Sequence, residues 1–203
     1  MATIYDVKPK FQALLRPVCR TMAGAGVTAN QVTTVAMLMS IGTGLLLWFI
    51  APWQPRWYLL APVVLFARMA LNAIDGMLAR EHGQKSALGG LLNELSDVVS
   101  DAALYLPMAA LGPRHASAAV AAVFLAALTE LAGVAAVQVG ASRRYDGPMG
   151  KSDRAFVFGV VYLLIGLGIR RGRWSAIVLV AVALLAGLTV LNRCRHALRE
   201  VRQ

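Results

Sequence analysis

Hydrophobic residues gather into six blocks along this chain, each separated from the next by a short polar or turn-forming segment. Most blocks approach the roughly 20 residues that an α-helix needs to cross about 30 Å of hydrocarbon. The pattern therefore predicts six transmembrane helices. Their expected ranges are 32–50, 57–80, 87–111, 117–139, 155–169 and 174–192.

The segment before the first block has a different pattern. Residues 3–20 mix apolar side chains with four basic ones, which is typical of an amphipathic helix lying on a membrane surface. The chain is thus expected to be an all-α integral membrane protein with a single domain over residues 1–203. Its expected parts are a surface helix with the loop that leads into the first span (1–31), a six-helix bundle (32–192) and a basic tail (193–203).

Composition supports a membrane protein over a soluble domain. Of the 203 residues, 58% are hydrophobic and 15% are charged, whereas a soluble domain has about 45–50% apolar and about 25% charged residues. Cys19 and Cys194 match no zinc or redox spacing and are expected to be free thiols. No removable signal peptide is expected, because the N-terminus lacks a basic segment followed directly by an apolar run.

The net charge is +10, and the distribution of the basic residues along the chain indicates the membrane topology. Six spans place both termini on one side, and 14 of the 20 Lys and Arg residues fall on that side against five on the other. Because basic loops remain in the cytoplasm, the termini are expected there. Basic and aromatic residues are not interleaved, so a nucleic-acid partner is not expected.

Polar and small residues inside the second and third predicted spans recur at spacings of three or four and so share one face of each helix. They are Asn72, Asp75 and Ala79 in the second span, and Gly89, Asn93, Asp97 and Asp101 in the third. A short turn joins the two spans, so their polar faces should meet at the cytoplasmic end. Ionisable residues in a span cost about 2.5–3.5 kcal/mol each on insertion scales and are functional candidates. Their oxygens suit Mg²⁺ or Mn²⁺ as ligands. Such cations commonly take part in reactions of phosphate groups.

The segment 75–97 reads DGMLAREHGQKSALGGLLNELSD and resembles the signature of the CDP-alcohol phosphotransferase (phosphatidyltransferase) family, D-x2-D-G-x2-A-R-x8-G-x3-D-x3-D. Six positions match with the same spacing: Asp75, Gly76, Ala79, Arg80, Gly89 and Asp97. Asn72 and Asn93 replace the first and third acidic residues. Asn30 and Thr33 resemble a short polar motif that the family has before its first span. Within the family the chain is most similar to the bacterial YnbA-type branch.

The resemblance implies a reaction in which an acceptor hydroxyl attacks the β-phosphorus of a CDP-linked alcohol and CMP leaves. It assigns metal binding to Asp75 and Asp97, and also makes Asp97 the general base. The nucleotide-binding positions that it implies are Gly76, Ala79, Arg80, Gly89, Asn30 and Thr33. Lys151 and Arg154 resemble a basic pair that binds an anionic acceptor, which we favour over the alternative that they are only positive loop charges.

The two asparagines lower the formal charge of the four signature positions from −4 to −2. Each amide still offers an oxygen, so Asn72 and Asn93 remain candidate metal ligands, with interhelical hydrogen bonding as the alternative. Asp101 lies about 6 Å beyond Asp97 along a helix and is a further candidate, as either ligand or structural partner. We expect one tightly held Mg²⁺ or Mn²⁺ and a second that binds with the substrate diphosphate.

Two other charges lie in the middle of predicted spans. Arg68 and Glu130 are expected to serve structure, as an ion pair with each other or with lipid. Neither lies in the signature.

Several functions remain open at this point. The first is an enzyme of the bacterial inner membrane, with its active site on the cytoplasmic side, that uses CDP-diacylglycerol and an alcohol acceptor. The second keeps the chemistry but uses a soluble CDP-alcohol and diacylglycerol. The third is a catalytically silent relative that binds nucleotide or lipid. A transporter is disfavoured, because its polar residues should lie at the membrane midplane. The resemblance also implies a homodimer.

Overall fold

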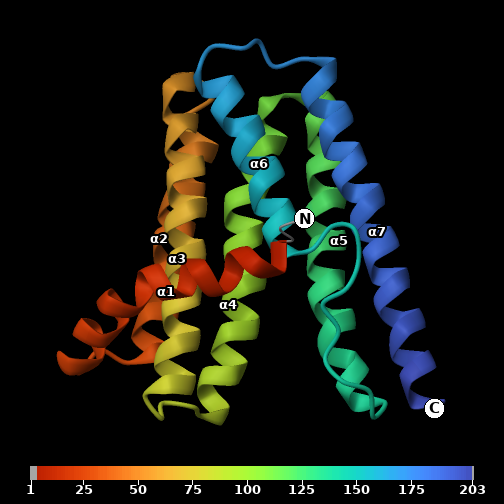
Figure 1. The fold of residues 1–203 in the computed structure, drawn as a ribbon. Helices are drawn as coiled ribbons and strands as arrows, with labels where there is room; N and C mark the ends of the chain where they lie inside the picture. Colours follow the sequence, from red (N-terminus) through yellow and green to blue (C-terminus); the bar gives the residue numbers. More distant parts are fainter. Residues whose placement is uncertain (1–3, 203) are drawn as a thin grey trace.

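The structure is a computed structural model that describes residues 4–202. These residues form a bundle of long helices with one helix lying across it (Figure 1). The long helices are α2 (Ala29–Phe49), α3 (Leu60–Glu81), α4 (Ala87–Tyr105), α5 (Pro113–Gln138), α6 (Lys151–Gly166) and α7 (Arg173–Val201). Two short 3₁₀ segments, η1 (Pro55–Leu59) and η2 (Leu106–Leu111), lie before α3 and after α4. The helix that crosses the bundle is α1 (Ile4–Gly24). No strand occurs between residues 4 and 202.

Four of these helical segments are long and apolar enough to cross a membrane: Ala29–Phe49, Pro55–Glu81, Pro113–Gln138 and Arg173–Val201. The expected all-α membrane protein is therefore confirmed. Within the described residues α4 and α6 do not meet this criterion: α4 carries Glu94, Asp97 and Asp101, and α6 has 16 residues. Six spans remain a prediction, as does the placement of α1 on a membrane surface.

Helix boundaries differ from the expected ones at two places that matter for the site. The fifth hydrophobic block was expected to begin at residue 155, but α6 begins at Lys151, so Lys151 and Arg154 belong to its first turn. The basic tail expected from residue 193 is a continuation of α7, which runs to Val201. Hydrophobicity marks only the part of a helix that contacts apolar surroundings, and both helices extend beyond that part.

Local hydrogen bonds fix the start of α2 beside the turn between α3 and α4. The Thr28 hydroxyl accepts a hydrogen bond from the Gln31 amide (3.2 Å), and the Gln31 side chain accepts one from the Thr28 amide (2.9 Å), which forms a capping box. From the turn, the Gln84 side chain accepts a hydrogen bond from the Ala29 amide (2.7 Å). The first turn of α2 therefore adjoins the junction that carries the signature.

Small residues allow the helices to approach closely. A Cβ added at Gly44 of α2 would collide with the carbonyl oxygen of Ala103 in α4, so only glycine permits this approach. Deeper in the bundle the ring of Tyr105 in α4 stacks on that of Phe158 in α6, with centroids 3.9 Å apart. These contacts hold α4 between α2 and α6 and so position its polar face.

Candidate functional site

A cavity of about 1000 Å³ opens at the end of the bundle where α3 ends and α4 begins. Its walls come from the first turns of α2, the end of α3, the start of α4, the loop between α5 and α6, and the start of α6. Most residues that the sequence singled out line it. They are Asn30, Thr33, Asn72, Asp75, Gly76, Ala79, Arg80, Gly89, Asn93, Asp97 and Lys151. Asp101 and Arg154 lie outside it.

Asp75 is a buried carboxylate on α3, with 5% of its surface exposed. Its Oδ2 accepts a hydrogen bond from the Thr33 hydroxyl at 2.8 Å. Thr33 itself is buried in the second turn of α2. The polar motif before the first hydrophobic block therefore supports a signature carboxylate directly, from a helix more than 40 residues away in the chain.

Asp97 on α4 is surrounded by donors. Its Oδ1 forms an ion pair with the Lys151 ammonium and accepts hydrogen bonds from Asn72 Nδ2 (3.2 Å) and Arg68 Nη2 (3.4 Å). Arg68 also donates to the backbone carbonyl of Asp97 at 3.1 Å. Two cations and one amide thus hold this carboxylate at the cavity wall, where its side chain is 12% exposed.

Two glycines of the signature let neighbouring side chains pack against the backbone at the cavity wall. A Cβ added at Gly89 would lie 2.8 Å from Asn30 Oδ1 and 3.0 Å from Ser86 Oγ. One added at Gly76 would lie 3.0 Å from the Arg80 guanidinium. A side chain at either position would therefore displace polar groups that line the cavity.

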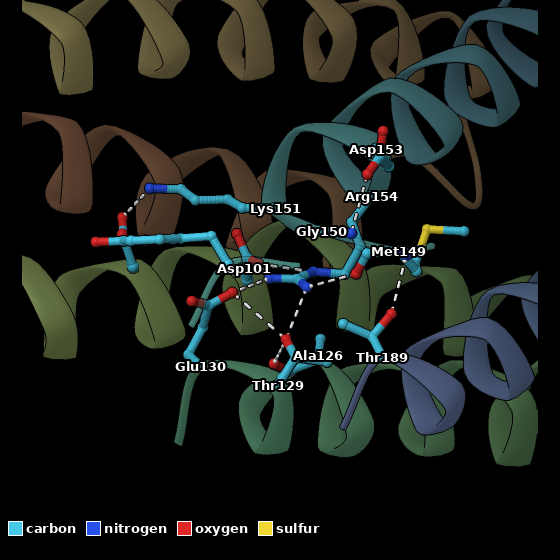
Figure 2. A network of polar contacts seen from close by, with 12 residues as sticks. Asp101, Ala126, Thr129, Glu130, Met149, Gly150, Lys151, Asp153, Arg154 and Thr189 are labelled. Atoms are coloured by element: carbon cyan, nitrogen blue, oxygen red, sulfur yellow. Dashed lines mark hydrogen bonds and ion pairs between the residues drawn. The ribbon is translucent and has the colours of Figure 1, made fainter. Parts of the chain in front are cut away.

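Arg154 is fully buried at the centre of a polar network (Figure 2). Its guanidinium donates to Asp101 Oδ2 (3.0 Å), to Glu130 Oε1 (2.8 Å) and to Thr129 Oγ1 (2.9 Å). A buried guanidinium with these partners cannot reach a ligand in the cavity. Arg154 therefore does not form the basic pair with Lys151 that the sequence suggested for an acceptor.

Asp101 is the other candidate that the cavity excludes. It is 5% exposed, and its Oδ1 accepts a hydrogen bond from Arg68 at 2.5 Å while Oδ2 contacts Arg154. Both oxygens are therefore engaged with protein cations. Asp101 was a candidate for either a metal ligand or a structural partner, and its position favours the structural role.

The expected pairing of Arg68 with Glu130 is wrong. Arg68 pairs with Asp97 and Asp101, whereas Glu130 pairs with Arg154 (2.8 Å) and Arg193 (3.7 Å). The reason is that α4 supplies the nearer carboxylates, Asp97 and Asp101. Both residues do serve ion pairs within the protein, as the structural interpretation expected.

The cavity residues that the sequence reasoning did not single out include Arg143 and Arg193. Arg143, in the loop after α5, forms an ion pair with Glu94 of α4. Arg193 of α7 is 2% exposed and donates to the backbone carbonyls of Thr129 and Asp146. The basic residues were counted only as topology signals, and no spacing rule joins α4, α5 and α7.

The donor set of the cavity suits a hard divalent cation. Carboxylate oxygens of Asp75 and Asp97 and amide oxygens of Asn72 and Asn93 line the same space, and Mg²⁺ and Mn²⁺ prefer such oxygen ligands. Within residues 4–202, however, no three His, Cys, Asp or Glu side chains are grouped closely enough to hold a metal. A cation bound here would need amide or substrate oxygens as well.

Comparisons with known proteins place these observations in context. The model of the family described as CDP-alcohol phosphatidyltransferase matches residues 26–191. The inner membrane protein YnbA of Escherichia coli K12 is 45% identical over 196 residues, which cover 97% of this chain and 96% of that protein.

Solved structures share the fold. Phosphatidylinositol phosphate synthase of Mycobacterium tuberculosis with CDP-DAG bound superimposes with a TM-score of 0.72 at 17% identity, covering 91% of this chain and 92% of that one. The same protein in complex with manganese and citrate gives a TM-score of 0.73 at 16% identity, covering 90% and 88%. At these identities the likeness shows a common arrangement of helices.

Proposed function

Because this chain belongs to the CDP-alcohol phosphatidyltransferase family, we propose that it transfers a phosphatidyl group from CDP-diacylglycerol to an alcohol hydroxyl and releases CMP. One observation carries the proposal. The matching signature residues of α3 and α4 and the polar motif of α2 all line one cavity of about 1000 Å³. That volume is at the upper end of the roughly 300–1,000 Å³ typical of small-molecule sites.

The proposed roles follow from position. A divalent cation, when bound, neutralises phosphate oxygens and stabilises the leaving group. Asp75 and the cavity amides would hold it. Asp97 accepts the proton of the attacking hydroxyl, whose oxygen forms a bond to the β-phosphorus as the bond from that phosphorus to the CMP oxygen breaks. Arg68 and Asn72 orient Asp97 for this transfer.

The nucleotide occupies the half of the cavity formed by α2, α3 and the start of α4. Gly76 and Gly89 leave the neighbouring polar side chains undisplaced there, and Arg80 and Lys85 supply positive charge for phosphate. The acceptor occupies the other half, between the loop that contains Arg143 and the starts of α4 and α6. Since CDP-diacylglycerol keeps its acyl chains in the bilayer, this arrangement suits a site at the inner leaflet of the bacterial inner membrane.

A second candidate is a relative that binds the nucleotide lipid without turnover. Asn72 and Asn93 favour it, because two acidic positions of the signature lack their charge. It predicts that CMP or CDP-diacylglycerol binds while no CMP is released at any metal concentration.

The test is a CMP-release assay on the purified, detergent-solubilised chain with CDP-diacylglycerol, Mg²⁺ or Mn²⁺ and a panel of alcohols. The panel includes inositol, glycerol and their phosphate esters, and a parallel arm supplies CDP-choline with diacylglycerol. We expect CMP and a new phospholipid only in the CDP-diacylglycerol arm and only with metal. Release confined to the CDP-choline arm would reverse donor and acceptor, and binding without release in either arm would establish the silent relative.

A further inference from the structure

We propose that the Lys151 ammonium takes the place of a second divalent cation at Asp97, so that the cavity holds a single cation, on the Asp75 side. The inference rests on the proposed function, since it concerns how the same site neutralises a diphosphate. In this proposal a lysine side chain supplies the positive charge that a second metal ion would otherwise supply.

Charge is the first argument. The four signature positions carry two carboxylates and two amides, a formal charge of −2. Two divalent cations would bring +4 into a site whose surroundings already include the Arg68 and Lys151 cations. Charges near a membrane interior need close compensation. With these two cations counted, the charges of the two carboxylates are already matched, so one divalent cation balances a substrate diphosphate of charge −2, whereas two would leave an excess of +2.

The contacts of Asp97 supply the second argument. Its Oδ1 already receives the Lys151 ammonium, and Asn72 donates its amide hydrogen to the same oxygen at 3.2 Å. A carboxylate at position 72 could not donate this bond and would repel Asp97 unless a cation lay between them. Asn72 and Lys151 therefore act together: the amide removes the need for a metal ion, and the ammonium supplies the positive charge.

The position of Lys151 supports this assignment. Lys151 is the first residue of α6, where the helix dipole disfavours a cation. Its side chain nevertheless reaches Asp97 on α4, and about a third of it is exposed to the cavity (32%). An ammonium with three donors can hold Asp97 and a phosphate oxygen at once. Arg154, three residues later, is sealed in the buried network and cannot share this role.

Asp75 has different surroundings, which suit a bound metal ion. Its one side-chain hydrogen bond comes from the neutral Thr33 hydroxyl. Among the residues that the structure describes, no Lys, Arg or His nitrogen lies within 4.0 Å of its carboxylate, in contrast to Asp97. No protein cation therefore occupies the position beside Asp75, and most of its lone pairs can accept a divalent cation.

The test is the number of Mn²⁺ ions bound per chain, measured by electron paramagnetic resonance with saturating CMP, which requires no turnover. The wild-type chain is expected to bind one. The triple variant Asn72→Asp/Asn93→Asp/Lys151→Met restores four carboxylates, removes the ammonium and is expected to bind two. Lys10→Met, which removes an exposed lysine of α1 that does not line the cavity, serves as the matched control and is expected to bind one.

Two tightly bound Mn²⁺ ions in the wild-type chain would overturn the inference, whether or not the triple variant folds. A folded triple variant that still binds one, checked by its melting curve and elution profile, would also overturn it. A failure of the proposed function would give a different result. The wild-type chain would then release no CMP but would still bind one Mn²⁺ ion.

Discussion

The two signature carboxylates of the cavity, Asp75 and Asp97, have unlike neighbours, and this difference gives them different chemistry. Asp97 is held from three sides by Lys151, Arg68 and Asn72, so its orientation is fixed. Asp75 receives one hydrogen bond, from Thr33. Fixed geometry suits a group that must meet a substrate hydroxyl, whereas a carboxylate with free lone pairs suits a metal ion.

Replacing Asp97 by asparagine tests its role as the base. Asp97→Asn keeps the size of the side chain and an oxygen for Lys151 and Arg68, but it cannot accept the hydroxyl proton. General bases contribute about 10²–10⁴-fold to rate, so CMP release should fall by at least about 100-fold while the melting temperature stays within a few degrees. A variant that retains activity within a few-fold of wild type would show that another group takes the proton.

Removing the Thr33 hydroxyl tests whether its hydrogen bond positions Asp75 for metal binding. Thr33→Val preserves shape but deletes the hydrogen bond to Oδ2. Loss of such an outer partner typically weakens metal affinity by about 10–100-fold, and we expect a Mn²⁺ dissociation constant raised within that range. The adjacent Thr34→Val is the control, because the Thr34 hydroxyl bonds only to the carbonyl of Asn30 in its own helix. Equal effects of the two variants would argue against a metal at Asp75.

Among the helices, the junction between α3 and α4 is built from local signals. Ser86 caps α4 by accepting a hydrogen bond from the Gly89 amide at 3.0 Å. The Asn30 side chain of α2 lies against Gly89, where a Cβ would meet it at 2.8 Å. The start of α4 therefore fits against α2 only while position 89 has no side chain.

A pair of neighbouring glycines tests this fit. Gly89→Ala should displace Asn30 and Ser86 and raise the dissociation constant of CMP by about tenfold or more, equal to about 1.4 kcal/mol. Gly90→Ala places its Cβ in open space, with nothing within 4 Å, and should leave CMP binding unchanged. Isothermal titration with CMP measures both. Similar affinities for the two variants would show that the nucleotide does not lie at this glycine.

Across the bundle, a network of buried ion pairs joins helices distant in the chain. Arg154 of α6 binds Asp101 of α4 and Glu130 of α5, and Arg193 of α7 binds Glu130 in turn. Removal of one partner from such a network leaves an uncompensated buried charge. The network thus ties together the four helices that form the acceptor half of the cavity.

The distribution of Lys and Arg predicts the orientation of the bundle. Because most of them lie on the side of the termini, a C-terminal fusion to green fluorescent protein should fluoresce in bacterial cells and one to alkaline phosphatase should be inactive. Phosphatase fused at the turn containing Gly112, at the opposite end of α5, should be active. An active C-terminal phosphatase fusion would invert the topology and move the cavity to the outer face.

Charge balance in the acceptor half predicts the class of alcohol. Its three cations each pair with a carboxylate: Arg143 with Glu94, Lys151 with Asp97 and Arg193 with Glu130. Because their charges are already matched, these cations attract a phosphate group less strongly, so we expect an uncharged polyol to give a kcat/KM about tenfold higher than its phosphate ester, a difference of about 1.4 kcal/mol. Paired CMP-release assays with inositol and inositol phosphate measure this ratio. Preference for the ester would show that Lys151 releases Asp97 to bind the acceptor.

The sequence was sufficient for everything that depends on helical geometry within one segment. Hydrophobic blocks located the helices, and spacings of three and four placed Asn72 with Asp75 and Ala79, and Asn93 with Asp97, at the cavity. These relations are local, because residues one turn apart share a face whatever the rest of the chain does. The family followed from the same spacings.

Contacts between helices could not be read in this way. Asp97 and Asp101 share a face of α4 and look equivalent in the sequence, yet one lines the cavity and the other is enclosed by Arg68 and Arg154. Likewise, nothing in the spacing joins Lys151 to Asp97. Which charges meet depends on the depth and rotation at which separate helices pack, and close packing of the assembled side chains settles both.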